Sequence, residues 1–134
     1  MATLTDREIA LLKGKNFAHL ATLNEDGSPH VAPLWIDVED EGGHVLVNSA
    51  VGRRKDRNIR RDPRVVVSVH DQSDPYIWTA ISGTVVSIET GDVAETHIDL
   101  LNQKYHDGER WTYVPGSVRV LYRIRPDRVV GEWE

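Results

Sequence analysis

Residues 48–67 read NSAVGRRKDRNIRRDPRVVV, and this stretch decides the fold. Gly52 separates an apolar strand over 44–49 from a basic segment over 53–62 that we expect to be helical. Pro63 ends that helix, because its ring cannot continue the helical hydrogen bonding. Consecutive β-branched residues then predict a strand over 65–70 that is buried on both faces. One basic helix therefore connects two strands directly.

The sequence on both sides of this stretch predicts a mainly β (α+β) fold. A capping box at Thr5 and Glu8 begins a helix, and turn residues such as Asp26-Gly27 separate consecutive strands. About seven antiparallel strands with three short helices favour a closed β-barrel over a doubly wound sheet. The expected helices cover 5–14, 53–62 and 92–106, and the expected strands cover 17–23, 30–38, 44–49, 65–70, 76–88 (bent at Gly83), 118–125 and 129–133, with a Pro126-Asp127 turn between the last two.

Length and composition indicate one globular domain over residues 1–134. Apolar residues make up 40% of the chain and charged residues 28%, which is an ordinary balance for a folded protein. No apolar run approaches the roughly 18 residues of a membrane helix, and the N-terminus does not resemble a secretory signal. The absence of cysteine excludes disulfides and cysteine-ligated metals. We therefore expect a cytoplasmic protein without a membrane span.

The charge is concentrated in one segment. Residues 53–64 contain seven basic and two acidic side chains, a net charge of +5 in a chain whose total is −5. The remaining residues therefore carry −10. Nucleic acid requires a broad positive surface, which such a chain does not offer. A compact basic patch favours a small, discrete anion instead.

The start of the basic helix is a candidate anion site. The first N–H groups of a helix have no intrahelical partner and carry partial positive charge, so Arg53 and Lys55 beside them favour a phosphate. A second interpretation is a solvated helix whose arginines pair with the acidic residues of the chain. It suits Arg60, Arg61 and Arg64 better, and the residues alone leave both interpretations open.

No catalytic group is evident in the sequence. The six histidines form neither an HxH nor an HExxH spacing, so we expect no metal site. If the protein is an enzyme, a bound cofactor supplies the chemistry. Tyr76 and Trp78 share one face of an expected strand, where an aromatic pair would line a flat-ligand pocket or a dimer interface. Core packing is the alternative explanation for the four tryptophans.

The residues from Gly52 to Arg64 follow the pattern G-R-x-K-x-x-N-[IL]-x-x-D-P-R. Together with the segments 20–22 (LAT) and 81–85 (ISGTV), this motif resembles the split-barrel flavin-binding superfamily of pyridoxamine 5′-phosphate oxidase-like proteins. Within it, the motif and the short length are most similar to the B-type reductases that use the deazaflavin coenzyme F-420. The resemblance covers nearly the whole chain and implies a split β-barrel of about seven antiparallel strands.

The resemblance also implies a homodimer with a cofactor in each groove between the subunits. Arg53 and Lys55 match the basic residues that hold the cofactor phosphate, and Arg54 and Asn58 belong to the same motif. Six further residues match other parts of the site. These are Asn48 and Ser49 near the ribityl chain and phosphate, Pro33 and Trp35 against the ring system, and Tyr76 and Trp78 from the other subunit.

The activity implied by the resemblance is hydride transfer from reduced coenzyme F-420 to a small-molecule acceptor, such as an activated alkene or a tetrapyrrole. No catalytic residue is assigned; His30, Tyr76 and Tyr113 are nominal proton donors, with solvent as the alternative. Two rival functions share this fold. One is an FMN-binding oxidoreductase, and the other is a non-catalytic protein that binds a flavin or haem.

Overall fold

The computed structural model describes residues 2–131, which form three helices and seven strands. This confirms the expected mainly β fold. The elements in chain order are α1 (Asp6–Lys13), β1 (Ala18–Leu23), β2 (Pro29–Leu34), β3 (Asp37–Val38), β4 (Val45–Ala50), α2 (Arg54–Arg61), β5 (Arg64–His70), β6 (Trp78–Glu89), α3 (Asp92–Tyr105) and β7 (Arg119–Gly131).

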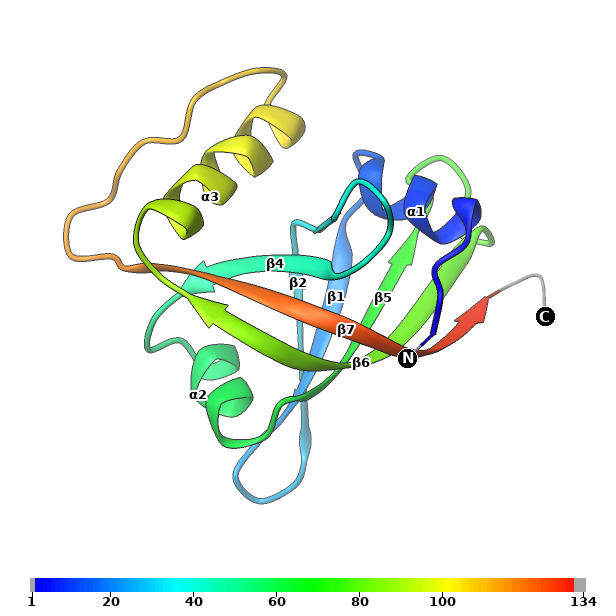
Figure 1. Ribbon diagram of the computed structural model, residues 1–134, viewed down its shortest axis with the longest axis horizontal. Helices are drawn as coiled ribbons and strands as arrows, with labels where there is room; N and C mark the ends of the chain where they lie inside the picture. The colour runs from blue at the N-terminus through cyan, green and yellow to red at the C-terminus, as the bar shows by residue number, and fades with distance from the viewer. Residues whose placement is uncertain (1, 132–134) are drawn as a thin grey trace.

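The strands form one curled antiparallel sheet in the order β2-β1-β5-β6-β7-β4-β3. The helices α1 and α2 lie at opposite ends of the sheet, and α3 lies beside β4 (Figure 1). Within residues 2–131, β2 and β3 each pair on one side only. The barrel is therefore split along these two edges, and the expectation of a closed barrel is wrong.

Two predicted strand boundaries are wrong. The expected strand over 30–38 is divided into β2 and β3, and the expected Pro126-Asp127 turn lies inside the continuous strand β7. Pro126 pairs with Gly83 and Arg128 with Ser82, so the intervening residue forms a β-bulge. The adjacent strand β4 pairs only with the first half of β7, so Pro126 needs no N–H donor on that side. The expected end of this strand at 132–133 lies outside the described residues.

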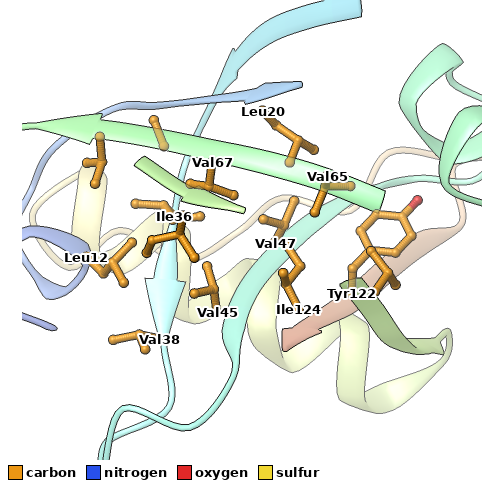
Figure 2. Packing of buried hydrophobic residues seen from close by; sticks show 14 of the residues in the cluster. Leu12, Leu20, Ile36, Val38, Val45, Val47, Val65, Val67, Tyr122 and Ile124 are labelled. Atoms are coloured by element: carbon orange, nitrogen blue, oxygen red, sulfur yellow. The ribbon is translucent and has the colours of Figure 1, made fainter. Parts of the chain in front are cut away.

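The hydrophobic core fills the inside of the curled sheet. Val47, Val65, Val67 and Tyr122 are buried there, and Figure 2 shows their side chains directed toward one another. On β5 burial alternates, with Val66 on the outer face 39% exposed. The expectation that β5 is buried on both faces is wrong, because nothing in the described chain covers the outer face of this strand.

Different interactions stabilise the helices α1 and α3. The expected capping box of α1 is present, with the Thr5 N–H donating to Glu8 Oε1 at 3.0 Å. A second apolar cluster holds α3, formed by Ile98, Leu101 and Tyr105 with two tryptophans from outside the helix. None of the helices in the described part of the chain is long and apolar enough to cross a membrane.

We predict that Gly83→Ala destabilises the protein. A Cβ at this position would lie 2.5 Å from Ile124 Cγ2 and 2.6 Å from the Arg125 carbonyl oxygen, and the backbone oxygen cannot move aside cheaply. The expected loss in unfolding free energy is about 1–3 kcal/mol, the usual range for overpacking. Urea unfolding measures it, with Ser82→Ala on the same strand as a control expected within about 0.5 kcal/mol of the wild type. Equal stability of the two variants would contradict the predicted clash.

Candidate functional site

The helix α2 begins at a left-handed glycine immediately after β4. Gly52 has φ +93°, and no heavy atom lies within 4 Å of where its Cβ would be. Arg53 is the N-cap residue, and its side chain does not cap the helix. The first-turn N–H groups therefore keep their partial positive charge for an external acceptor. This is the local geometry that the motif predicted.

The acidic side chain of the first turn of α2 is directed into the barrel. Asp56 is buried and accepts hydrogen bonds from the Gly52 N–H at 2.9 Å, from Arg60 Nε at 3.0 Å and from the Tyr122 hydroxyl. Burial alone would raise the pKa of this carboxyl, but these hydrogen bonds hold it below its usual value. Asp56 is therefore ionised and already satisfied. It does not neutralise the exposed side chains around it.

Three cations that repel one another lie at the start of α2 without an acidic partner among the described residues. Within residues 2–131, the side chains of Arg53 and Lys55 make no hydrogen bond or ion pair. Arg119 is opposite Ala50 in the β4–β7 register, directly before the motif. Burial lowers the pKa of Lys55, and the nearby charges of Arg53 and Arg119 lower it further. Three mutually repelling cations are a candidate site for an anion.

Three other arginines of the motif are held by the protein itself. Arg60 pairs with Asp56, Arg61 donates to the Leu23 carbonyl oxygen at 2.7 Å, and Arg64 pairs with Asp62 at 2.7 Å. Arg60 and Arg64 therefore pair with acidic side chains, as the second interpretation expects, whereas Arg61 binds neutral acceptors.

Asn58 and Arg54 face the β1–β2 turn. The buried amide of Asn58 donates to Thr22 Oγ1 and to Asn24 Oδ1, both at 3.0 Å, and accepts from Arg61. Arg54 Nη1 donates to the same Asn24 oxygen at 3.4 Å. Asn58 therefore fixes α2 to the sheet with all of its amide atoms. Its expected contact with the cofactor stays a prediction.

Asn48 and Ser49 are neighbours on β4, so their side chains lie on opposite faces of the sheet. Asn48 is directed toward α3, where its Nδ2 donates to the Ala94 carbonyl oxygen at 2.9 Å, and its Oδ1 accepts from Arg119 Nε at 2.9 Å. Ser49 is buried, and its Oγ has no partner within the described residues. Asn48 thus holds one of the three cations, and Ser49 keeps an unused hydroxyl.

The structure does not bring Pro33 and Trp35 to the start of α2. Pro33 is opposite His19 in the β1–β2 register, whereas α2 contacts the other end of β1. Trp35 lies between β2 and β3 rather than in a strand as expected, and it stacks on Tyr105 with ring centroids 5.1 Å apart. Both residues therefore lie at the end of the sheet that is remote from α2.

Tyr76 and Trp78 also lie far from the cations of the same chain. Tyr76 is in the turn before β6, so the expectation that both residues share a strand face is wrong. Only Trp78 belongs to the strand, where it pairs with His70. The strand β5 separates this turn from α2, a distance of about 20 Å at 3.3 Å per residue. Tyr76 is 82% exposed.

The three nominal proton donors lie in unlike surroundings. His30 on β2 is half-buried, and its Nδ1 has no partner within residues 2–131. Tyr76 and Tyr113 are exposed. Tyr113 borders a cavity of about 380 Å³ that is also lined by Trp111 and Arg119. This cavity adjoins the candidate anion site through Arg119.

Sequence reasoning missed Arg119, Asp56 and His97. Arg119 is far from the motif in sequence, and only the β4–β7 register brings it there. Asp56 was counted as a charge within the motif, without a signal that it is buried. His97 contacts Asn48 through Nδ1 at 3.1 Å, and its Nε2 is buried without a partner in the described chain.

Comparison with known protein families identifies the class of protein to which this split barrel belongs. The pyridoxamine 5′-phosphate oxidase family profile matches residues 4–131. The chain therefore belongs to this family, as the motif indicated.

Two relatives are named as reductases. A 5a,11a-dehydrotetracycline/5a,11a-dehydrooxytetracycline reductase of Streptomyces rimosus is 33% identical over 93 residues, which span 65% of this chain and 66% of that protein. The solved structure of an F-420 reductase is 32% identical with a TM-score of 0.78, covering 90% of this chain and 94% of that one. A third similar structure, an FAD-binding protein of Mesorhizobium loti, is 26% identical with a TM-score of 0.62, covering 97% of this chain and 95% of the other. The comparisons support an oxidoreductase.

We predict that His97 makes the stability depend on pH. Burial lowers the pKa of His97 to about 4, against the attraction of Asp37, and Arg123, Lys104 and Arg119 lower it further. The unfolded chain, with a pKa near 6.5, binds more protons below this value than the folded chain does. Stability is therefore lost as the pH falls from 6.5 through 4, by about 3 kcal/mol from this group.

Urea unfolding at several pH values checks this prediction. The His97→Asn variant has no titrating group at this position, so its unfolding free energy should fall less steeply between pH 6.5 and 4 than that of the wild type. Parallel profiles for the two proteins would contradict the assignment.

Proposed function

We propose that this protein is an oxidoreductase that binds reduced coenzyme F-420 and reduces a small organic acceptor. The observation that carries the proposal is the set of three cations, Arg53, Lys55 and Arg119, which has no acidic partner in the described chain. The 32% identity to an F-420 reductase over 90% of the chain supports this choice of cofactor. When bound, the coenzyme supplies the hydride.

The donors at the start of α2 fit the phosphate group of such a cofactor. Arg53 and Arg119 offer guanidinium N–H groups, and Lys55 adds a half-buried ammonium. The open space around Gly52 lets a phosphate approach the backbone N–H groups. The part of these residues is to bind and orient the cofactor. Orientation matters because hydride transfer requires the acceptor carbon at about 3–3.5 Å from the donor.

FMN also carries a phosphate, and the similarity to an FAD-binding protein favours a flavin as the second candidate cofactor. The three cations do not discriminate between the two phosphates. Equilibrium titration of the protein with coenzyme F-420 and with FMN, followed by tryptophan fluorescence, tests the choice. Tight binding of F-420 with weak FMN supports the reductase and justifies a screen of conjugated alkenes and tetrapyrroles. The reverse result replaces it by the FMN-dependent oxidoreductase, and tight binding without turnover of any acceptor supports a flavin or haem carrier.

We also propose that the protein is a cytoplasmic homodimer in which each cofactor site combines both subunits. The aromatic residues Tyr76 and Trp78 lie about one strand length from the cations at the start of α2 in their own chain. A partner subunit would bring them beside those cations, and the exposed Tyr76 is available for such a contact. Pro33, on the exposed side of the edge strand β2, would approach the cofactor ring in the same way.

We predict that Arg53→Ala with Lys55→Ala weakens the binding of coenzyme F-420. Each charge-assisted hydrogen bond contributes about 1.5–3 kcal/mol, so the double variant should lose more than about 100-fold in affinity. Arg57→Ala is the matched control, because Arg57 is an exposed arginine of the same helix outside the cation cluster. Its affinity should stay within about threefold of the wild type. Equal losses in the control and the double variant would show that only overall charge matters.

The dimer has its own test. Light scattering at micromolar concentration should give twice the mass of the chain, about 30 kDa, from a subunit of 15.1 kDa. In the dimer, Tyr76→Ala should weaken coenzyme binding, although Tyr76 is remote from the cations of its own subunit. A monomer that binds the coenzyme with undiminished affinity would overturn the shared site.

A further inference from the structure

A buried network of hydrogen bonds connects the anion site to the helix α3. Asn48 lies at its centre, and the Asn48 network consists of Asn48, Ala94, His97 and Arg119. We propose that His97 is a positioning residue of the anion site, which acts by fixing the amide of Asn48 and thereby the guanidinium of Arg119. This inference rests on the proposed function and deepens it, because it explains how the third cation is held.

The chemistry of the partners fixes every donor in this network. Arg119 can only donate, so the Asn48 atom at 2.9 Å from its Nε is the oxygen. The Ala94 carbonyl oxygen can only accept, so the Asn48 atom at 2.9 Å from it is the nitrogen. The same nitrogen lies 3.1 Å from His97 Nδ1. His97 Nδ1 must therefore accept, which requires a neutral ring with its proton on Nε2.

His97 is a fixed part of the protein interior. It is 6% exposed, and its burial between α3 and the sheet favours the neutral ring that the hydrogen bond requires. Ala94 and His97 are three residues apart on α3, so they form one face of the helix toward β4. Together they hold both hydrogens of the Asn48 amide group. Rotation of this amide would place its NH₂ group against Arg119, donor against donor.

The position of Arg119 follows from the position of Asn48. Only the Nε of Arg119 is engaged, so its terminal NH₂ groups stay free for an anion within the described residues. The guanidinium carbon also lies 5.2 Å from the centre of the Trp111 ring, which limits rotation on the other side. Arg119 is thus oriented before any anion arrives, and a preorganised donor binds more tightly than a mobile one.

The test is a double-mutant cycle on anion affinity. His97→Leu removes the acceptor for Asn48, whereas His97→Asn keeps an acceptor oxygen near the place of Nδ1. The affinities of these variants for inorganic phosphate and for coenzyme F-420 are measured at pH 7.5 by calorimetric titration, each with and without Arg119→Ala. We expect His97→Leu to weaken binding by about threefold or more, and His97→Asn to restore most of the loss. In the Arg119→Ala background, the substitution of His97 should have no further effect.

Several results would overturn the proposal. An equal loss from His97→Leu with and without Arg119 would mean that His97 is only structural, and an unchanged affinity would mean that it does not position Arg119. If His97→Leu does not fold, Asn48→Ala enters the same cycle, because it removes the oxygen that holds Arg119. Phosphate binding without F-420 binding would reject the proposed cofactor while leaving the cycle intact. Binding of neither probe would reject the anion site and the role of His97 together.

Discussion

The buried carboxylate of Asp56 holds the candidate site in place. It joins the Gly52 N–H, the Arg60 guanidinium and the hydroxyl of Tyr122, which is in the core of the barrel. An ionised buried carboxylate is costly unless all of its partners stay in place. The N-terminus of α2 is therefore fixed relative to the barrel wall. The same arrangement directs the acid of the first turn inward, so Asp56 does not pair with Arg53 or Lys55.

The motif thus combines residues with two different tasks. Asp56, Asn58 and Ile59 are buried and attach α2 to the sheet, whereas the side chains of Arg53 and Lys55 make no hydrogen bond or ion pair within the described part of the chain. The helical period explains the division, because residues three apart such as Asp56 and Ile59 lie on the same face. A single short run can therefore define both the support and the charge of an anion site. This is why the motif alone indicated so much of the fold.

Features that depend on residues close together in the sequence were predicted well, and features that depend on residues far apart were not. Helix α2 and its boundaries depend on Gly52 and Pro63, which are local signals, and they were predicted within one or two residues. The proline at 126 was misread as a turn, because its place opposite Gly83 at a bulge depends on strand pairing. The alternating burial of β5 was missed for a similar reason. A run of β-branched residues does not reveal which face of a sheet is covered.

The same limit applies to the site. Arg53 and Lys55 were found from the motif and Asn48 from the resemblance, whereas Arg119 enters only through the pairing of β4 with β7. Sequence spacing carries no information on the contact between Asn48 and Arg119, which are 71 positions apart. The resemblance predicted the aromatic residues of the site, Trp35, Tyr76 and Trp78. Within one chain these residues lie at the other end of the sheet from α2.

The electrostatics of the three cations argue that the protein is built around an anion. Burial and mutual repulsion lower the pKa of both Lys55 and Arg119, so the folded chain without a counter-charge is less stable than it would be with one. A purely structural surface would relieve such repulsion with one of the many acidic residues of this chain. Asp56 is the nearest candidate in sequence, and it is turned away into the core. An anion bound under the proposed function would supply the missing counter-charge, and its binding would then contribute to the stability of the fold as well.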